Sequence, residues 1–235
     1  MPQPTPSIAT PPSLLPIEIL YEDTDLLVVN KPADLLTVPG RGPDKQDCLI
    51  NRITDYGRSN DSDNSPTARW AGARIIHRLD MATSGIVILA LNHATQAAMG
   101  KLFSERKIAK RYIATVAGQV TRTEDINLPL ICDWPNRPKQ KVDHEQGKHA
   151  TTQISLVSYN PNNNTSRVLL TPITGRSHQL RVHMLAIGHP ILGDYFYAPP
   201  DINNQSERLL LHAEYIAFLH PVTQEHINIH CPATF

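Results

Sequence analysis

One polar turn of the sequence places an acid beside a base. The turn is His77-Arg78-Leu79-Asp80 followed by Met81-Ala82-Thr83-Ser84-Gly85, between two predicted strands. A carboxylate next to a cation can serve acid–base chemistry or stabilise a developing charge. In isolation, the commoner role of such an aspartate is to accept hydrogen bonds from backbone N–H groups in the turn.

Two further segments carry polar side chains in patterns that suggest a site. Lys110-Arg111-Tyr112 combines a basic pair with a tyrosine, although a tyrosine of the core is the ordinary interpretation of that residue alone. In the segment 174–183, a glycine turn leads into a predicted helix that begins with the donors of Arg176 and His178. A helix N-terminus with an arginine binds anions, so phosphate is a natural ligand. Arg181 follows on the same face of that helix.

The sequence lacks the motifs that hold common cofactors. It contains no G-x-G-x-x-G, no phosphate loop ending in Gly-Lys-Ser/Thr, no H-E-x-x-H and no G-x-S-x-G. His178 and His183 are five residues apart, so on a helix they point about 140° away from each other and cannot share an ion. We therefore expect neither a cofactor nor a metal.

Short strands with interspersed helices must position these segments. The predicted strands are residues 26–29, 86–91, 111–116, 154–159, 167–170, 209–212, 215–219 and 226–230. One helix is predicted after Asn92, which can cap it, and a second over residues 177–187, where Gly188 and Pro190 end it. Residues 55–67 are predicted to form a polar loop. Without a regular strand–helix alternation, an α+β fold is favoured over a doubly wound sheet.

Composition is typical of a single globular domain in a reducing compartment. Of 235 residues, 40% are hydrophobic, and no apolar run approaches the roughly 20 residues of a membrane span. The three scattered cysteines provide no disulfide framework, and no secretory signal is present, so we expect a cytoplasmic location. Six prolines make residues 1–16 a predicted flexible tail, followed by one domain over 17–235. We expect a monomer that does not bind membranes.

Taken together and in order, the three segments resemble the motifs of RluA-type RNA pseudouridine synthases. Asn30-Lys31-Pro32 with Leu35-Leu36-Thr37-Val38-Pro39-Gly40 is similar to the family's opening motif, although Asp34 replaces the usual glycine. Asp tolerates a left-handed backbone better than most residues, so this departure should be well accommodated. The resemblance runs from about residue 17 to the end of the chain, and residues 128–142 look like the branch with dual RNA specificity.

The resemblance implies a pseudouridine synthase fold: a mixed, largely antiparallel sheet with flanking helices and a central RNA-binding cleft. It implies that uridine in RNA is isomerised by breaking the N1–C1′ bond and joining C5 to C1′. By motif, Asp80 is the catalytic carboxylate, Tyr112 packs on the target base and Arg181 is the ion-pair partner of Asp80. Arg78 resembles the arginine that lies near the flipped nucleotide. These roles are physically reasonable, because positive charge develops at C1′ and a nearby arginine keeps a carboxylate ionised.

The same resemblance directs attention to RNA contacts. Besides Arg176 and His178, the candidates are Arg137, Lys139 and Lys141 in the loop 133–149, which could instead be a merely solvated basic loop. The expected substrates are uridine 32 of tRNA anticodon stem-loops and uridine 746 of 23S (large-subunit) rRNA, each flipped out of its helix. Many relatives carry an extra N-terminal RNA-binding domain; the short tail cannot form one, so substrate choice must come from the catalytic domain.

Two alternatives stay open at the level of sequence. A non-catalytic RNA-binding module would have no need for Asp80, Tyr112 and Arg181 together. A glycoside or nucleoside hydrolase built around Asp80 would normally use a second carboxylate, and no motif supplies one.

Charge distribution supports a nucleic-acid partner despite a net charge of zero. Residues 1–70 contain 6 Lys and Arg against 10 Asp and Glu, and residues 191–235 contain 1 against 5. Residues 71–190, which carry the three chemical segments, contain 15 against 7. RNA responds to the local field of a cleft rather than to the total charge of a chain.

Overall fold

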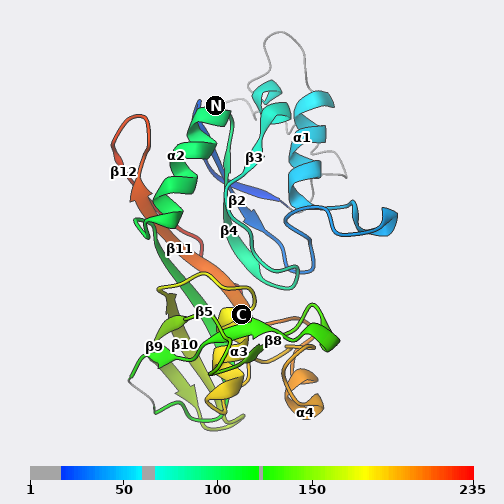
Figure 1. Ribbon diagram of the computed structural model, residues 1–235, viewed down its shortest axis with the longest axis vertical. Helices are drawn as coiled ribbons and strands as arrows, with labels where there is room; N and C mark the ends of the chain where they lie inside the picture. Colours follow the sequence, from blue (N-terminus) through cyan, green and yellow to red (C-terminus); the bar gives the residue numbers. More distant parts are fainter. Residues whose placement is uncertain (1–16, 60–66, 122–123) are drawn as a thin grey trace, which may run out of the picture.

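The structure is a computed structural model that describes residues 17–59, 67–121 and 124–235 (Figure 1). The tail predicted for residues 1–16 and residues 60–66 of the predicted polar loop lie outside the described residues. Residues 55–59 correct the loop prediction, because they complete helix α1 (Leu49–Ser59). The helix extends this far because Ile53 and Tyr56 bury one face in the core, while its polar residues face solvent.

One sheet runs through the whole molecule. Its strands, in spatial order, are β1 (Glu18–Glu22), β2 (Leu26–Lys31), β4 (Ser84–Ala90), β11 (Leu211–Leu219), β5 (Ala109–Ala117), β10 (Thr165–Pro172), β9 (Thr151–Asn160) and β6 (Ile126–Asn127). β3 (Arg74–Ile75) pairs with β4, and β12 (His226–His230) pairs with β11. The pairings are antiparallel except that of β4 with β11. The predicted α+β class with a mixed, largely antiparallel sheet is confirmed.

In the N-terminal half, the sheet is covered on both faces. Alternate residues of a strand point to opposite faces, so the apolar runs of β2 and β4 supply two cores. Leu27 and Val87 pack in the cluster that contains Ile53 of α1. Val28 and Ile88 pack in the cluster that contains Met99 of α2 (His93–Ser104). As predicted, Asn92 caps α2: its side-chain oxygen accepts from the backbone N–H of Thr95 at 2.8 Å.

In the C-terminal half, β5 and β10 pack against helix α3 (Gln179–Ala186). Leu180 and Met184 of α3 join Val168 of β10 in one cluster. The predicted helix starts two residues too early, because His178 has a left-handed φ of 54° and α3 begins only at Gln179. The predicted end is confirmed, since Gly188 has a φ of 82° just beyond the helix.

The two halves meet where β11 lies between β4 and β5. The sequence predicts separate strands for residues 209–212 and 215–219, but residues 211–219 form the single strand β11, whose register shifts between Ala213 and Tyr215. Such a bulge shifts the side-chain alternation without ending the strand, which explains the misassignment. Gly85 is needed at this junction: its φ is 112°, and a Cβ there would lie 2.4 Å from the Ala213 carbonyl oxygen.

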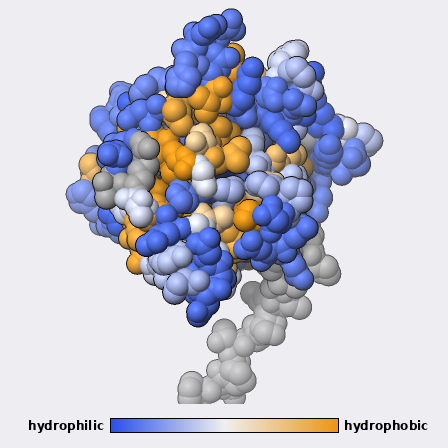
Figure 2. Space-filling model, turned by 90° about the horizontal axis from the view of Figure 1, so that it is seen from below, coloured by the Kyte–Doolittle hydropathy of each residue, from blue (hydrophilic) through white to orange (hydrophobic). Residues whose placement is uncertain are grey.

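Smaller elements lie beside α3. A separate ribbon pairs β7 (Leu130–Cys132) with β8 (Gln140–Val142), and the single-turn helix α4 (Pro200–Asn203) lies in the segment between α3 and β11. Viewed from this end, the surface has hydrophilic side chains around its rim and apolar side chains nearer the middle (Figure 2). Among the described residues, no helix has the length and apolar character needed to span a bilayer.

Candidate active site

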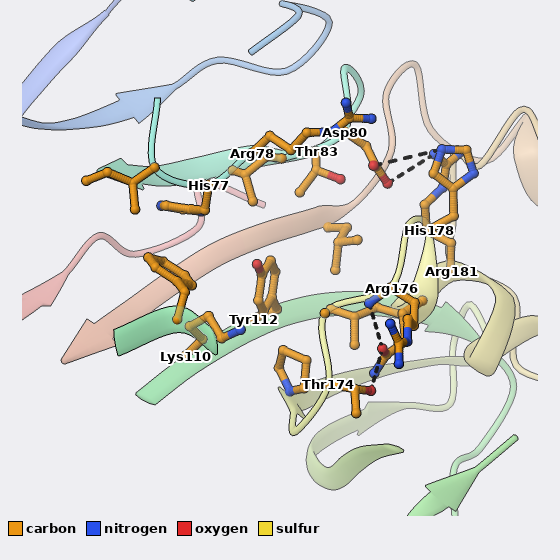
Figure 3. A pocket seen from close by; sticks show the side chains of 18 residues that line it. His77, Arg78, Asp80, Thr83, Lys110, Tyr112, Thr174, Arg176, His178 and Arg181 are labelled. Carbon is orange, nitrogen blue, oxygen red and sulfur yellow. Dashed lines mark hydrogen bonds and ion pairs between the residues drawn. The ribbon is translucent and has the colours of Figure 1, made fainter. Parts of the chain in front are cut away.

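A cavity of about 340 Å³ opens where the two halves meet (Figure 3). The structure brings most of the predicted site residues to its walls: Arg78, Asp80, Tyr112, Arg176, His178 and Arg181. They come from the turn between β3 and β4, from β5 and from the start of α3. Arg137, Lys139 and Lys141 do not line the cavity, because they lie on or beside the β7–β8 ribbon.

The turn that carries Asp80 is held on both sides by the opening motif. The Thr37 hydroxyl donates to the Leu79 carbonyl at 2.8 Å, and the Lys31 ammonium donates to the Met81 carbonyl at 3.0 Å. The Lys31 ammonium also donates to the carbonyls of Pro32 and Leu35, both at 2.8 Å. Burial lowers the pKa of Lys31 to about 7. The predicted accommodation of Asp34 is also confirmed, because that residue has a left-handed φ of 60°.

Arg181 faces two carboxylates at different distances. Its guanidinium donates to both oxygens of Asp194, at 2.8 and 2.6 Å, and both side chains are almost fully buried. The Asp80 carboxylate lies 3.6 Å from Arg181 Nη1, so the predicted ion pair is present but is the longer of the two. Asp194 thus fixes the guanidinium, and Asp80 keeps its oxygens available to the cavity.

Sequence reasoning missed Asp194, although a signal was present. Gly193 immediately precedes it, and its φ is 71° with the Arg208 carbonyl only 1.9 Å from where a Cβ would lie. This tight turn directs the backbone N–H groups of Phe196 and Tyr197 onto the Asp194 carboxylate, at 3.1 and 3.2 Å. A Gly-Asp pair followed by three aromatic residues therefore marked a structured turn.

The aromatic residues of that turn surround Arg181. Its guanidinium carbon lies 5.8, 5.2 and 5.1 Å from the ring centroids of Tyr195, Phe196 and Tyr197. Aromatic faces attract cations at such distances. Two kinds of contact, carboxylate and ring, therefore immobilise the arginine.

His178 occupies the position just before α3. Its Nδ1 lies 2.6 Å from the Tyr197 hydroxyl, which also accepts from the Gln140 backbone N–H at 2.8 Å. Its Nε2 lies 3.8 Å from an Asp80 oxygen (Figure 3). Burial lowers the pKa of His178, although the Asp80 charge opposes the shift. The imidazole is therefore neutral near pH 7.

The segment before His178 is fixed by a buried glutamine. The Gln179 carbonyl oxygen accepts from the Thr174 hydroxyl at 2.7 Å and from the Arg176 backbone N–H at 3.0 Å. Its amide nitrogen donates to the Thr151 carbonyl at 2.9 Å. The exposed Arg176 guanidinium is thereby placed at the rim of the cavity, where it donates to the His149 carbonyl at 3.2 Å.

Tyr112 forms another wall of the cavity. Burial, and secondarily the Asp80 charge, raise the pKa of its phenol well above the ordinary value. The phenol therefore stays protonated and can donate a hydrogen bond or present its ring face. Nearby, His77 Nε2 accepts from the Ile88 backbone N–H at 3.0 Å, and burial lowers the pKa of His77 to about 3.

A larger groove, of about 770 Å³, continues from the cavity. It shares Lys110 and Arg176 with the cavity and adds Arg106 and Lys107. Sequence reasoning did not single out these cations, because Arg106 and Lys107 follow α2, about seventy residues before Arg176. The groove gives the cavity a basic extension suited to a phosphate backbone.

The ribbon cations have a different setting. The segment predicted as a loop contains β8 and the turn before it. Arg137 stacks on the exposed Trp134 ring at 3.9 Å, and Lys141 lies 3.9 Å from Asp143. The ribbon connects to the site through Gln140 and Tyr197.

Within the described residues, Asp80 is the single carboxylate that lines the cavity. It has cationic or polar groups on one side and a tyrosine ring on another. A glycoside hydrolase normally uses two carboxylates, one as acid and one as base or nucleophile. The described walls of this cavity supply only one.

One cluster outside the cavity has metal-ligand residue types: Asp23, Asp25 and His220. Its hydrogen bonds do not fit a metal. His220 Nδ1 accepts from the Val222 and Thr223 backbone N–H groups, so Nε2 carries the proton, 3.1 Å from Asp23. The cluster instead ties together the turns near β1 and β12.

The comparisons with known proteins agree with this geometry. A family model described as RNA pseudouridylate synthase matches residues 25–186. The chain belongs to the RNA pseudouridine synthases. Within them it is of RluA type. It is 48% identical over 227 residues to the dual-specificity RNA pseudouridine synthase RluA of Escherichia coli strain K12, covering 96% of this chain and 97% of the relative. The Pasteurella multocida (strain Pm70) relative of the same description is 45% identical over 227 residues, with the same coverage.

Solved structures show the same fold. Human RNA Pseudouridylate Synthase Domain Containing 1 aligns with a TM-score of 0.72 at 28% identity, over 93% of this chain and 84% of that chain. Human RNA Pseudouridylate Synthase Domain Containing 4, at 24% identity, supports the fold with a TM-score of 0.70 over 91% and 87% of the chains. This pseudouridine synthase is therefore an RNA-modifying isomerase, and the alternatives of a non-catalytic module and a hydrolase are not favoured.

Proposed function

We propose that this pseudouridine synthase uses Asp80 to isomerise uridine 32 of tRNA anticodon stem-loops and uridine 746 of 23S rRNA. The observation that carries the proposal is the Asp80 carboxylate, the single acid among the described cavity-lining residues, 3.6 Å from a guanidinium that Asp194 already holds. The names of the relatives, which describe dual specificity, support two kinds of RNA substrate.

In this mechanism, Asp80 acts at C1′ of the target nucleotide. When the N1–C1′ bond breaks, positive charge develops at C1′, and the carboxylate stabilises or captures that carbon. The detached uracil turns, C5 bonds to C1′, and C5 then loses its proton while N1 gains one. The numbers of atoms and electrons in uridine and pseudouridine are equal, so no co-reactant is required.

Tyr112 and Arg181 support this step in different ways. The Tyr112 ring supplies a face on which the uracil can stack, and its protonated phenol can donate a hydrogen bond. The Arg181 guanidinium favours the ionised form of Asp80 from a fixed position.

The target uracil can enter this cavity only after it has left its helix, because a paired base is inaccessible. Arg78 is exposed on the wall beside Asp80 and can occupy the space that the flipped nucleotide vacates. Arg176 lies at the rim, the neutral His178 lies deeper on the wall beside Asp80, and Arg137, Lys139 and Lys141 would contact the stem from the ribbon. One copy of the chain supplies every residue named here, which supports a monomer as the active form.

Tritium release tests the proposal. RNA carrying tritium at uridine C5 is incubated with the protein, and release is measured while pseudouridine is mapped on tRNA and on a 23S rRNA fragment. We expect release from both RNAs, and loss of release when uridine 32 or uridine 746 is replaced by cytidine. Release that persists after both replacements would contradict the proposed targets, and full release by Asp80→Asn would contradict the proposed carboxylate.

A further inference from the structure

The Thr83 hydroxyl is a buried polar group without a partner. Thr83 lines the cavity, its residue is 2% exposed, and its Oγ1 has no hydrogen-bond partner among the described residues. Buried hydroxyl groups are nearly always hydrogen-bonded, because leaving one unpaired destabilises the fold. An unpaired hydroxyl on the wall of a catalytic cavity indicates that the substrate supplies its hydrogen-bond partner.

The surroundings make this exception specific to one side chain. The next residue, Ser84, uses its hydroxyl fully, at 2.8 Å from His212 Nδ1 and 2.5 Å from Arg208 Nη2. The Thr37 hydroxyl both donates to and accepts from the backbone of Leu79. The Ser84 and Thr37 hydroxyls therefore have roles in the fold, and that of Thr83 has no such role among the described residues.

Thr83 lies on the same wall as the catalytic carboxylate. Its backbone N–H donates to the Asp80 carbonyl at 3.1 Å, which closes the turn between them. Figure 3 shows the Thr83 oxygen on the side of the chain that faces the Asp80 carboxylate. A nucleotide whose C1′ faces Asp80 therefore presents its atoms nearest C1′ to this wall.

We infer that the Thr83 hydroxyl hydrogen-bonds an oxygen of the target uridine next to C1′, either the uracil O2 or the ribose 2′-hydroxyl. The inference rests on the proposed role of Asp80 at C1′. Negative charge spreads onto the uracil O2 when the N1–C1′ bond breaks, and a donor placed there stabilises the transition state. A bond to the 2′-hydroxyl would instead hold the ribose in register with the carboxylate.

The test compares Thr83→Val with Thr83→Ser in single-turnover tritium release, on whichever RNA the unaltered protein modifies. Valine has nearly the shape of threonine without the hydroxyl, so we expect a fall of about ten-fold in rate with an unchanged or higher Tm. Serine retains the hydroxyl and should stay within about three-fold of the unaltered rate. An unaltered rate in Thr83→Val, or losses in both variants that follow a fall in Tm, would overturn the inference.

Thr95→Val is the matched control. Thr95 is similarly buried, but its hydroxyl donates to Asp25 at 3.1 Å, and neither residue lines the cavity. We expect this variant to lower Tm and to leave the rate of the folded protein unchanged, the opposite of Thr83→Val. A rate loss in Thr95→Val equal to that in Thr83→Val would assign the effect to the fold and overturn the inference.

A substrate change then identifies the oxygen. If the valine penalty disappears with 2-thiouridine at the target, the partner is the uracil O2; if it persists, the partner is the 2′-hydroxyl. A failure of the proposed function is distinguishable, because Asp80→Asn would then retain activity whatever the behaviour of Thr83→Val.

Discussion

The two walls of the cavity are anchored by buried charges of opposite sign. On one wall, the Lys31 ammonium joins the Met81 carbonyl of the Asp80 turn to the Pro32 and Leu35 carbonyls of the opening motif, and it has no carboxylate within hydrogen-bond reach among its described partners. On the other wall, the Asp194 carboxylate holds the Arg181 guanidinium with two charge-assisted bonds. One anchor holds main chain, and the other holds a side chain.

The two anchors differ in whether their charge can change with pH. Arg181 has a permanent charge in a permanent place, because guanidinium groups do not lose their proton and Asp194 compensates the burial. Burial of the Lys31 ammonium outweighs the opposing charges of Asp34 and Asp80 and lowers its pKa to about 7, so its charge varies with pH. The charge of Lys31 beside the Asp80 turn should therefore vary with pH near and above neutrality, whereas the charge of Arg181 on the other wall stays fixed.

The largest effect on activity is expected from Asp80→Asn, which removes the single carboxylate that lines the described part of the cavity. Because nothing else on the described cavity walls can replace a carboxylate at C1′, tritium release should fall at least ~10³-fold. Among the described residues, the ion-pair partners of Asp80 lie 3.6 and 3.8 Å away, so the free energy of unfolding should change by less than about 1 kcal/mol. A large stability loss in urea denaturation would show that Asp80 serves the fold instead.

Arg181→Met removes the buried ion pair with Asp194 on the second wall. It leaves Asp194 buried without its cation, so we expect about 3 kcal/mol lower stability in urea denaturation. Turnover should fall more than RNA affinity, because Arg181 faces Asp80 rather than the rim.

Adding Asp194→Asn to Arg181→Met separates the two effects. The double variant should regain stability, since no unpaired charge stays buried, without regaining turnover. An equal loss of affinity and turnover in Arg181→Met would instead make Arg181 a phosphate contact.

The pH dependence of stability tests the Lys31 wall. Its pKa is about 7 in the folded protein and near 10.5 when unfolded, so the unfolded chain binds more protons between these values. The free energy of unfolding should therefore rise with pH, by about 2 kcal/mol between pH 7 and pH 9. Urea denaturation at several pH values measures the slope, and Lys31→Met should lack this part of it. Parallel slopes in the two proteins would contradict a titrating lysine.

The smallest effect is expected from Tyr197→Phe, because Tyr197 contacts His178 beside Arg181 but not Asp80 directly. The change removes the hydroxyl that joins the Gln140 N–H to His178, so stability should fall by about 1 kcal/mol. Turnover should fall only a few-fold, since Asp194 still holds Arg181. Thermal unfolding and tritium release measure both. A fall in turnover as large as that of Arg181→Met would mean that His178 is the main partner of Asp80.

Much of the fold was predictable because its signals are local. The buried run of β4, the Asn92 cap and the glycine after α3 each depend on a few consecutive residues. The start of α3 and the bulge in β11 were missed because a left-handed histidine and a register shift depend on what lies opposite. Residues 55–59 appeared polar, yet the core on one face of α1 makes them helical.

Local motifs were enough to predict the family, the α+β class and the candidate residues Asp80, Tyr112 and Arg181, because each motif spans only a few consecutive residues. How these side chains are held depends on contacts between segments that are distant in the sequence. Lys31 reaches Met81 across 50 residues, Thr37 reaches Leu79 across 42, and Asp194 takes the shorter bonds to Arg181. Such pairings, like the unpartnered hydroxyl of Thr83, depend on burial and distance, which residue order does not specify.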